Sequence, residues 1–309
     1  MNISETPRGT YRIDWRGGYL ELNLTPMNPH VGARYAHVLP EDVLSNSIHD
    51  FVGVTALGFD LAPVNPRIVW DNREHHWWDG FEGCFEPRNT VVNSPAVRRV
   101  QADGSVEASF YFIANHVQTT VAWKIHDPQD SPHRAKWDTR ITVENPRPLV
   151  LNNYLQLFAC YHKPGSNYYW DVGNRIERCG AGGFYATCDQ ETLDRIWSTP
   201  VKRTLDRYRG NAEFVCAQYA RPMLLSERCD WFGGGRHVLM VDPAACAALV
   251  TWLGQARDHM VGPAGGRLAP GESFTARIRH LVTTVDDVRD VQRLWDKFED
   301  EALSGTGGA

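Results

Sequence analysis

The chain has 309 residues, of which 42% are hydrophobic and 22% charged, a composition typical of a folded globular protein. Its formal net charge of −5, from 32 basic and 37 acidic side chains, argues against a nucleic-acid binder and offers no polybasic patch to a membrane. The apolar stretches are too short to cross a bilayer, and the polar first residues lack the apolar segment of a signal peptide.

The seven cysteines are scattered and include no Cys-x-x-Cys pair, so neither a disulfide framework nor a zinc knuckle is indicated. We therefore expect a reduced, cytoplasmic protein. Aromatic residues are abundant, with 11 Trp, 11 Tyr and 12 Phe, and several Trp stand beside charged residues and His. Such side chains suit either a large β core or the walls of a half-hydrated cleft.

Most of the chain is predicted to form strands. Residues 40–49 are a candidate short helix, and a long strand region over 105–125 breaks near Asn115 and His116. Turn signals rich in Gly, Pro, Asn and Asp separate the later elements. The remaining predicted strands cover residues 137–143, 149–162, 214–219, 237–241, 247–253 and 273–283.

One convincing helix is predicted near the C-terminus, over residues 285–303. Its apolar residues recur at the spacing of a single helical stripe, and Thr284 or Asp286 is the expected cap at its start. Many strands without alternating helices indicate an all-β fold, an antiparallel β-sandwich with a short C-terminal helix. We predict a single domain over residues 1–303 and a disordered tail over 304–309.

The segment over residues 267–280, RLAPGESFTARIRH, resembles the closing strand of galactose-mutarotase-like β-supersandwich proteins. In that family a Leu-x-Pro-Gly-Glu turn leads into an alternating final strand. The resemblance implies a supersandwich fold and a sugar-handling function. The catalytic Glu and His of the family find no residue-by-residue match here, so the resemblance assigns no catalytic residue.

The densest polar and aromatic cluster spans residues 71–89. Its acid/base candidates are His75 or His76 and Glu82 or Glu86, because His titrates near neutral pH and a carboxylate beside Trp is desolvated. On a strand the two adjacent His would face opposite ways, so one of them would face a given site. A surface loop held by packed Trp is the alternative. The substrate-positioning candidates are Arg73, Trp77, Trp78 and Arg88.

A second cluster lies in residues 149–171, where alternation directs the Leu residues of the strand toward the core. The opposite face carries Asn152, Gln156 and His162, and amide groups offer both the donors and the acceptors that hydroxyl groups need. Tyr168 and Trp170 follow in an aromatic loop whose rings would stack on a sugar. A plain solvent-facing strand is the alternative.

Together these clusters predict a carbohydrate-active enzyme that uses side-chain acid/base catalysis and no organic cofactor. Mutarotation or epimerisation, lyase-type elimination and glycoside hydrolysis all fit. The catalytic candidates are His75 or His76, Glu82 or Glu86, and His162. The expected partner is a sugar or similar polyhydroxylated molecule, with no nucleic acid and no membrane, and a homo-oligomer is left open.

Three other functions would use parts of the same pattern. A metal-dependent β-sandwich enzyme would bind a divalent metal through His75 or His76 together with Glu86, His116 and His162. The spacing of these residues lacks the His-x-His…Glu pattern of metal cupins, so no metal site is assigned. A non-catalytic glycan-binding module would use the same Trp and Tyr, and a lipocalin-like isomerase would need an apolar cavity. Weaker candidates are Arg34, His37 and residues 231–237, which surround three Gly.

Overall fold

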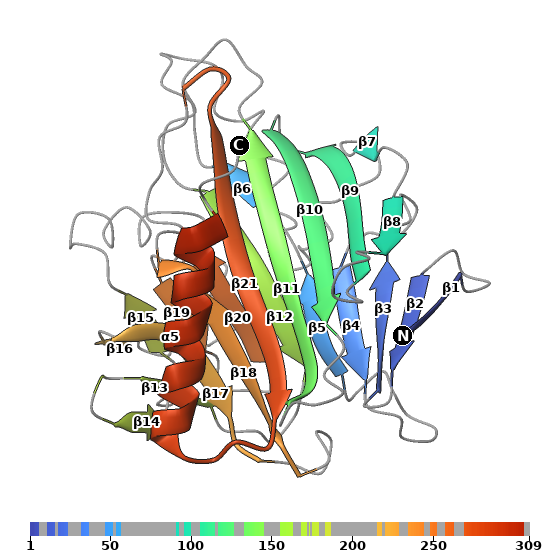
Figure 1. The fold of residues 1–309 in the computed structure, drawn as a ribbon. Coiled ribbons are helices and arrows are strands. Elements are labelled where there is room, and N and C mark those ends of the chain that lie inside the picture. Colours follow the sequence, from blue (N-terminus) through green and yellow to red (C-terminus); the bar gives the residue numbers. More distant parts are fainter. Residues whose placement is uncertain are drawn as a thin grey trace.

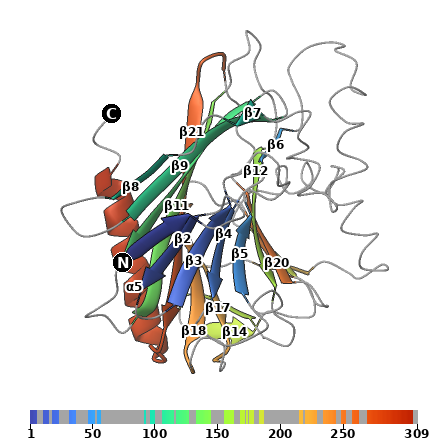
Figure 2. The same ribbon diagram turned by 90° about the vertical axis from the view of Figure 1, so that its right-hand side faces the viewer.

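The structure is a computed structural model that describes residues 1–5, 11–15, 18–23, 32–36, 47–51, 54–56, 91–92, 96–99, 106–114, 117–126, 133–144, 155–162, 168–171, 173, 175–178, 183–186, 215–217, 220–228, 234–243, 248–251, 257–262 and 269–305. These residues form two large sheets that face each other, with a helix on the outer side of one of them (Figures 1 and 2). No helix in this part of the chain is long and apolar enough to cross a membrane.

The first sheet has eleven strands and begins at the N-terminus of the chain. Its order is β1 (Asn2–Glu5), β2 (Tyr11–Trp15), β3 (Gly18–Asn23), β4 (Gly32–Ala36), β5 (Ser47–Phe51), β12 (Leu155–His162), β20 (Arg257–Gly262), β19 (Ala248–Thr251), β15 (Gly183–Ala186) and β16 (Val215–Ala217), with β6 (Val54–Ala56) beside β12.

The second sheet has ten strands. Its order is β14 (Ile176–Arg178), β13 (Tyr168–Asp171), β17 (Arg221–Ser226), β18 (Arg236–Val241), β21 (Ser273–Thr283), β11 (His133–Glu144), β10 (Val117–His126), β9 (Val106–Ala114) and β7 (Val91–Val92), with β8 (Ala96–Arg99) beside β9. The described pairings are antiparallel except for β15 with β16. This architecture confirms the predicted antiparallel β-sandwich.

The main core lies between the two sheets. Alternate residues of the ten-stranded sheet, among them Trp123, Ile125 and Trp137, are fully buried. Ile13 of β2 is equally buried and belongs to the other sheet. Because side chains alternate between the faces of a strand, these residues mark the inner face of each sheet.

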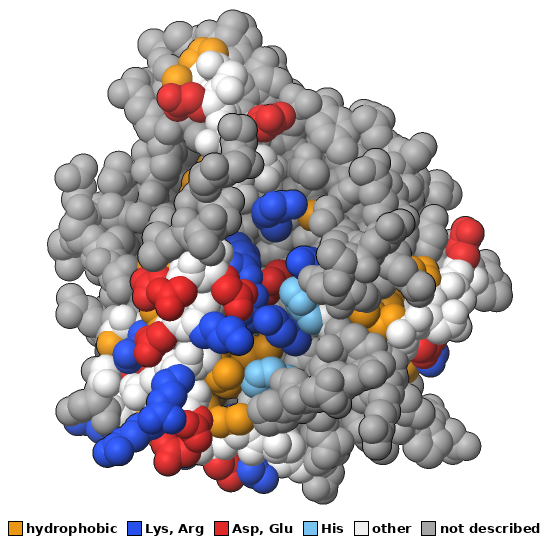
Figure 3. Space-filling model, in the orientation of Figure 1, with side chains coloured by type: hydrophobic (Ala, Val, Ile, Leu, Met, Phe, Trp, Pro, Cys, Tyr) orange, Lys and Arg blue, Asp and Glu red, His pale blue; other side chains and the backbone are white. Residues whose placement is uncertain are grey.

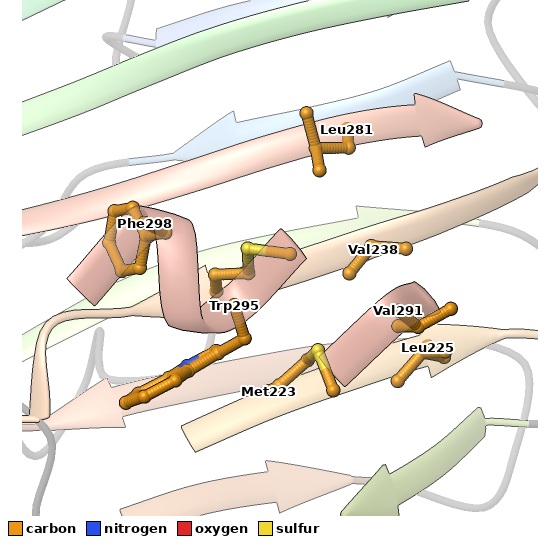
Figure 4. Packing of buried hydrophobic residues seen from close by; sticks show 8 residues of the cluster. Met223, Leu225, Val238, Leu281, Val291, Trp295 and Phe298 are labelled. Carbon is orange, nitrogen blue, oxygen red and sulfur yellow. The ribbon is translucent and has the colours of Figure 1, made fainter. Parts of the chain in front are cut away.

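A second apolar layer lies between the ten-stranded sheet and helix α5 (Val288–Gly305), which covers the outer face of that sheet (Figures 1 and 4). The helix contributes Val291, Trp295 and Phe298, three members of the apolar stripe that the sequence predicts. The sheet contributes Met223, Leu225, Val238, Met240 and Leu281.

Two sequence predictions need correction near helices. Asp287 caps α5, because its carboxylate accepts a hydrogen bond from the backbone N–H of Arg289 at 2.7 Å, so the caps predicted at Thr284 and Asp286 are wrong. The helix predicted over residues 40–49 is wrong at its C-terminal end, where β5 begins at Ser47; residues 40–46 lie outside the described residues.

The turn before the last strand agrees with its sequence signal. Pro270 and Gly271 occupy its central positions, and the N–H of Glu272 donates to the carbonyl of Ala269 at 3.0 Å. Gly271 has φ of 78°, a conformation that residues with a Cβ rarely adopt. Strand β21 then covers residues 273–283, the range predicted from the sequence.

Candidate functional site

Most of the predicted site residues lie outside the part of the chain that the structure describes, and their roles stay predictions. They are Arg73, His75, His76, Trp77, Trp78, Glu82, Glu86, Arg88 and Asn152, together with His116 of the metal alternative.

Four predicted residues lie on described strands. Gln156 and His162 belong to β12, a central strand of the eleven-stranded sheet. Tyr168 and Trp170 belong to β13, which pairs with β14 and β17 in the ten-stranded sheet. The structure therefore separates the aromatic pair from the polar pair by placing them in different sheets.

The register of the eleven-stranded sheet identifies which of its faces points inward. Ile13 is paired with Leu20, which is paired with Tyr35, and this row continues through Ile48 to Tyr161 of β12. Residues directly opposite each other in an antiparallel pair share a face. Ile13 is fully buried, whereas Arg12 and Asp14 on the opposite face are partly exposed, so we assign the row to the inner face. Tyr19, the partner of Asp14 on that opposite face, is also buried.

The neighbouring residues on each strand lie on the outer face. Arg12 and Asp14 flank Ile13, and their side chains are 38% and 34% exposed and joined by a hydrogen bond of 2.9 Å. The row through Arg12 continues to Glu21, then to Arg34 and then to His49. Glu21, Arg34 and His49 are therefore consecutive register partners on three adjacent strands, β3, β4 and β5.

Strand β12 continues this outer face. His162 is paired with Ser47, which lies two residues before His49 on β5, so the two His residues share a face. Gln156 lies six residues before His162 and therefore shares that face as well.

Strand β20 adds a carboxylate on the other side. Cys160 lies two residues before His162 and is paired with Asp258. Asp258 consequently belongs to the same face, whereas His259, which is paired with Ala159, belongs to the inner face. The strands β4, β5, β12 and β20 are consecutive in the sheet, so these polar residues span about 14 Å at the usual strand spacing.

We call this set the outer-face polar row; it comprises Glu21, Arg34, His49, Gln156, His162 and Asp258. It combines groups that exchange protons near neutral pH with groups that hold hydroxyls or anions. Two of its members, Gln156 and His162, are sequence candidates, and Arg34 is a weaker one.

Sequence reasoning missed Glu21, His49 and Asp258. His49 stands in the stretch interpreted as a helix, and Asp258 follows a segment without any motif. The alternation of β5 around His49, Ser-Ile-His-Asp-Phe, is a signal that favours a strand. Without the pairing of β5, β12 and β20, nothing in the sequence connects these residues.

A second pair of His residues is unsuited to substrate contact. His237 and His280 are 1% and 0% exposed, and their rings lie between the two sheets, with Nε2 of His237 at 3.3 Å from Nδ1 of His280. The ring of His280 stacks on Trp137 with 4.6 Å between centroids. His237, which the sequence placed among the weaker candidates, is thus a core residue.

Among the described residues, no three His, Cys, Asp or Glu side chains are grouped closely enough to hold a metal ion.

No protein-family model and no curated protein matches the chain. Among solved structures, a putative aldose 1-epimerase from Escherichia coli K12 is 11% identical, with 89% of this chain and 99% of that chain covered and a TM-score of 0.43. A galactose mutarotase-like protein from Clostridium acetobutylicum is 10% identical, with coverages of 89% and 95% and a TM-score of 0.42. A galactose mutarotase related enzyme from Lactobacillus acidophilus is 11% identical, with coverages of 90% and 99% and a TM-score of 0.43. The fold class rests on the chain's own strand pairing.

Proposed function

We propose that the protein is a carbohydrate-active enzyme that acts on a sugar by side-chain acid/base catalysis, on the outer face of the eleven-stranded sheet. One observation carries the proposal: the strand register places His49 and His162 on the same outward face of adjoining strands.

The chemistry follows from what two nearby imidazoles can do. One neutral His takes the proton of the anomeric hydroxyl, while a protonated His donates a proton to the ring oxygen. The bond between the anomeric carbon and the ring oxygen breaks, the carbonyl form results, and reclosure on the other face of the carbonyl gives the other anomer. Each positioned group contributes roughly 10²- to 10⁴-fold to the rate.

Among the reactions that fit, mutarotation requires the fewest additional parts. It consumes no water and needs no organic cofactor, and its proton donor and acceptor exchange roles in the reverse direction. Elimination and glycoside hydrolysis would need a further group, for which Glu82 and Glu86 are the candidates. Arg34, Gln156 and the Trp residues at positions 77 and 78 would position the sugar, and we place the enzyme in the cytoplasm on the ground of its scattered cysteines.

The test is an anomer-equilibration assay by polarimetry or NMR with a panel of freshly dissolved aldoses. The parent protein should accelerate equilibration of at least one of them above the buffer rate. His49→Gln and His162→Gln should each lower turnover by roughly 10²-fold or more.

The matched control is His259→Gln, which changes the same residue type in the same sheet on the inner face. It should leave the turnover of the folded protein within a factor of a few. Equal losses in all three variants would contradict an outer-face site. Binding of a sugar without turnover of any substrate class would instead favour the glycan-binding module.

A further inference from the structure

A cluster of charged side chains lies on the outer face of the ten-stranded sheet, beside helix α5. Lys and Arg side chains gather there with acidic and His side chains in the middle of the face shown in Figure 3. The cluster draws on three elements, namely β11, β21 and α5. Its members are Lys136, Asp138, Arg277, Arg279, Lys297 and Glu301.

Two carboxylates pair with the two arginines of this cluster. Asp138 accepts hydrogen bonds from Nε and Nη2 of Arg279, at 2.7 and 3.0 Å, and one from Arg277 at 2.9 Å. Glu301 accepts from Nη2 of Arg279 at 2.6 Å and from Nη2 of Arg277 at 3.2 Å. These bonds attach the C-terminal turns of α5 to the sheet.

The bonds leave open donors at both arginines. Every one of the bonds just described uses Nε or Nη2 of Arg279 and Nη2 of Arg277. The Nη1 groups therefore donate to no residue in the described part of the chain. Arg279 is 3% exposed, and its guanidinium and that of Arg277 lie over the ring of Phe298, at 5.1 and 4.8 Å from the centroid, which fixes both in place.

The positive charges of the cluster exceed its negative charges by two. Four cations face two carboxylates, and within the described ranges neither Lys136 nor Lys297 forms an ion pair. Arg140, which is exposed and paired in register with Arg277, adds a further positive charge at the edge. This excess is notable in a chain whose net charge is −5.

Burial and the neighbouring charges shift the pKa values of two nearby groups. Burial lowers the pKa of Lys136, and the charge of Arg279 lowers it further, whereas Glu301 and Asp138 act in the opposite direction. Burial also lowers the pKa of His133 to about 4, with the charges of Lys136, Arg279 and Lys297 acting in the same direction. These three charges that act on His133 are thus all positive and come from cations of the cluster.

We propose that Lys136, Arg279 and Lys297 bind a phosphate or phosphoryl group on this outer face. A phosphate dianion would balance the two excess charges, and its oxygens would accept from the two ammonium groups and from the open Nη1 donors. The site is a different one from the proposed sugar site, because the two lie on outer faces of opposite sheets. A phosphorylated sugar or free phosphate would supply the same chemistry.

Isothermal titration calorimetry of the full chain with inorganic phosphate, at low and constant ionic strength, tests the proposal. The parent protein should show saturable binding, and Lys136→Gln and Lys297→Gln should each weaken it by about tenfold or more. Arg289→Gln is the matched control, since it removes one exposed cation from the other end of the same helix. Binding that is unchanged in both lysine variants would overturn the proposal.

An NMR titration of the His133 imidazole gives a second readout that does not depend on catalysis. A bound phosphate anion stabilises the protonated ring, so saturating phosphate should raise the pKa of His133, whereas chloride at equal ionic strength should not. Equal shifts with both salts would indicate screening only and would reject the site. If glucose 6-phosphate binds more tightly than inorganic phosphate and glucose itself does not bind, the ligand is a phosphorylated sugar. If glucose 6-phosphate and inorganic phosphate bind with equal affinity, the ligand is free phosphate.

Discussion

Asp138 and Arg279 form a buried, two-hydrogen-bond ion pair although 141 positions separate them in the sequence. They lie directly opposite each other on β11 and β21, the two longest neighbouring strands of the ten-stranded sheet. Burial alone would raise the pKa of Asp138, but hydrogen bonds from His126 and Arg279 outweigh it and hold the pKa well below its usual value. The pair joins two strands and, through Glu301, the terminal helix.

Asp138→Asn should therefore destabilise the protein strongly. The substitution keeps the size of the side chain but leaves the buried guanidinium of Arg279 with Glu301 as its one charged partner among the described residues. Loss of one member of a buried pair costs about 3–5 kcal/mol. Guanidinium denaturation measures the loss, and Asp14→Asn is the control, because the exposed Arg12–Asp14 pair is worth less than about 1 kcal/mol.

Stability should decrease between pH 6.5 and about 4 because of His133. Its pKa falls from the model-compound value of 6.5 to about 4 on folding, chiefly through burial. The unfolded chain binds the proton more readily than the folded protein in this interval. The contribution of His133 to the free energy of unfolding is therefore fully present above pH 6.5 and decreases as the pH falls. The loss should be about 2 kcal/mol after allowance for solvent screening.

The comparison of parent protein and His133→Gln isolates this contribution from the other His residues. The variant carries no titrating group at position 133, so its free energy of unfolding should depend less steeply on pH across the interval. Identical pH profiles of the two proteins would mean that His133 titrates normally in the folded state.

Phe298→Ala should destabilise the protein by about 3–5 kcal/mol, the usual cost of removing a buried aromatic ring. Phe298 is fully buried between α5 and the sheet, and its ring also supports the guanidinium groups of Arg277 and Arg279. Thermal unfolding measures the effect. A cost no greater than that of the exposed-site variant Val288→Ala would contradict the packing described for α5.

Asp287→Ala should cost about 1 kcal/mol, because it removes the carboxylate that accepts the N–H of Arg289 at the start of α5. Asp286→Ala instead removes a highly exposed carboxylate that pairs with Arg228 and Arg236. The ranking of the two variants in denaturant midpoint distinguishes the two candidate caps. A larger effect at Asp286 would return the cap to the position predicted from sequence.

Local patterns predicted the elements whose signals are contained in a single segment. The break at Asn115 and His116 separates β9 from β10, β21 covers residues 273–283 as predicted, and the stripe with Trp295 and Phe298 forms α5. These segments carry alternation, a turn signal or a helical stripe of their own. Propensity and spacing were therefore sufficient.

Segments with weak local signals were missed. The prediction contained no strand in the first 100 residues, where β1 to β5 form nearly half of the eleven-stranded sheet, and it missed β17, whose second residue is Pro222. Strand β5 exists because it pairs with β4 and β12, and the partner residue of Ser47 is more than a hundred positions away. The outer-face polar row has the same origin, since pairing of distant strands, and no motif, brings His49 beside the strand of His162.

The last prediction tests whether the predicted loop residues and the outer-face polar row act on the same sugar. Glu86→Gln keeps the shape of the side chain but removes its charge, so turnover should fall by roughly 10²-fold or more if Glu86 exchanges a proton with the substrate. Trp78→Ala should mainly raise KM through lost ring stacking.

The decisive variant combines Glu86→Gln with His162→Gln. Groups that act on one ring as a unit are strongly non-additive, so the double variant should be little slower than the slower single variant. Fully multiplicative losses would mean that the two residues act independently, which would exclude Glu86 from the proton transfer and leave His49 as the partner of His162.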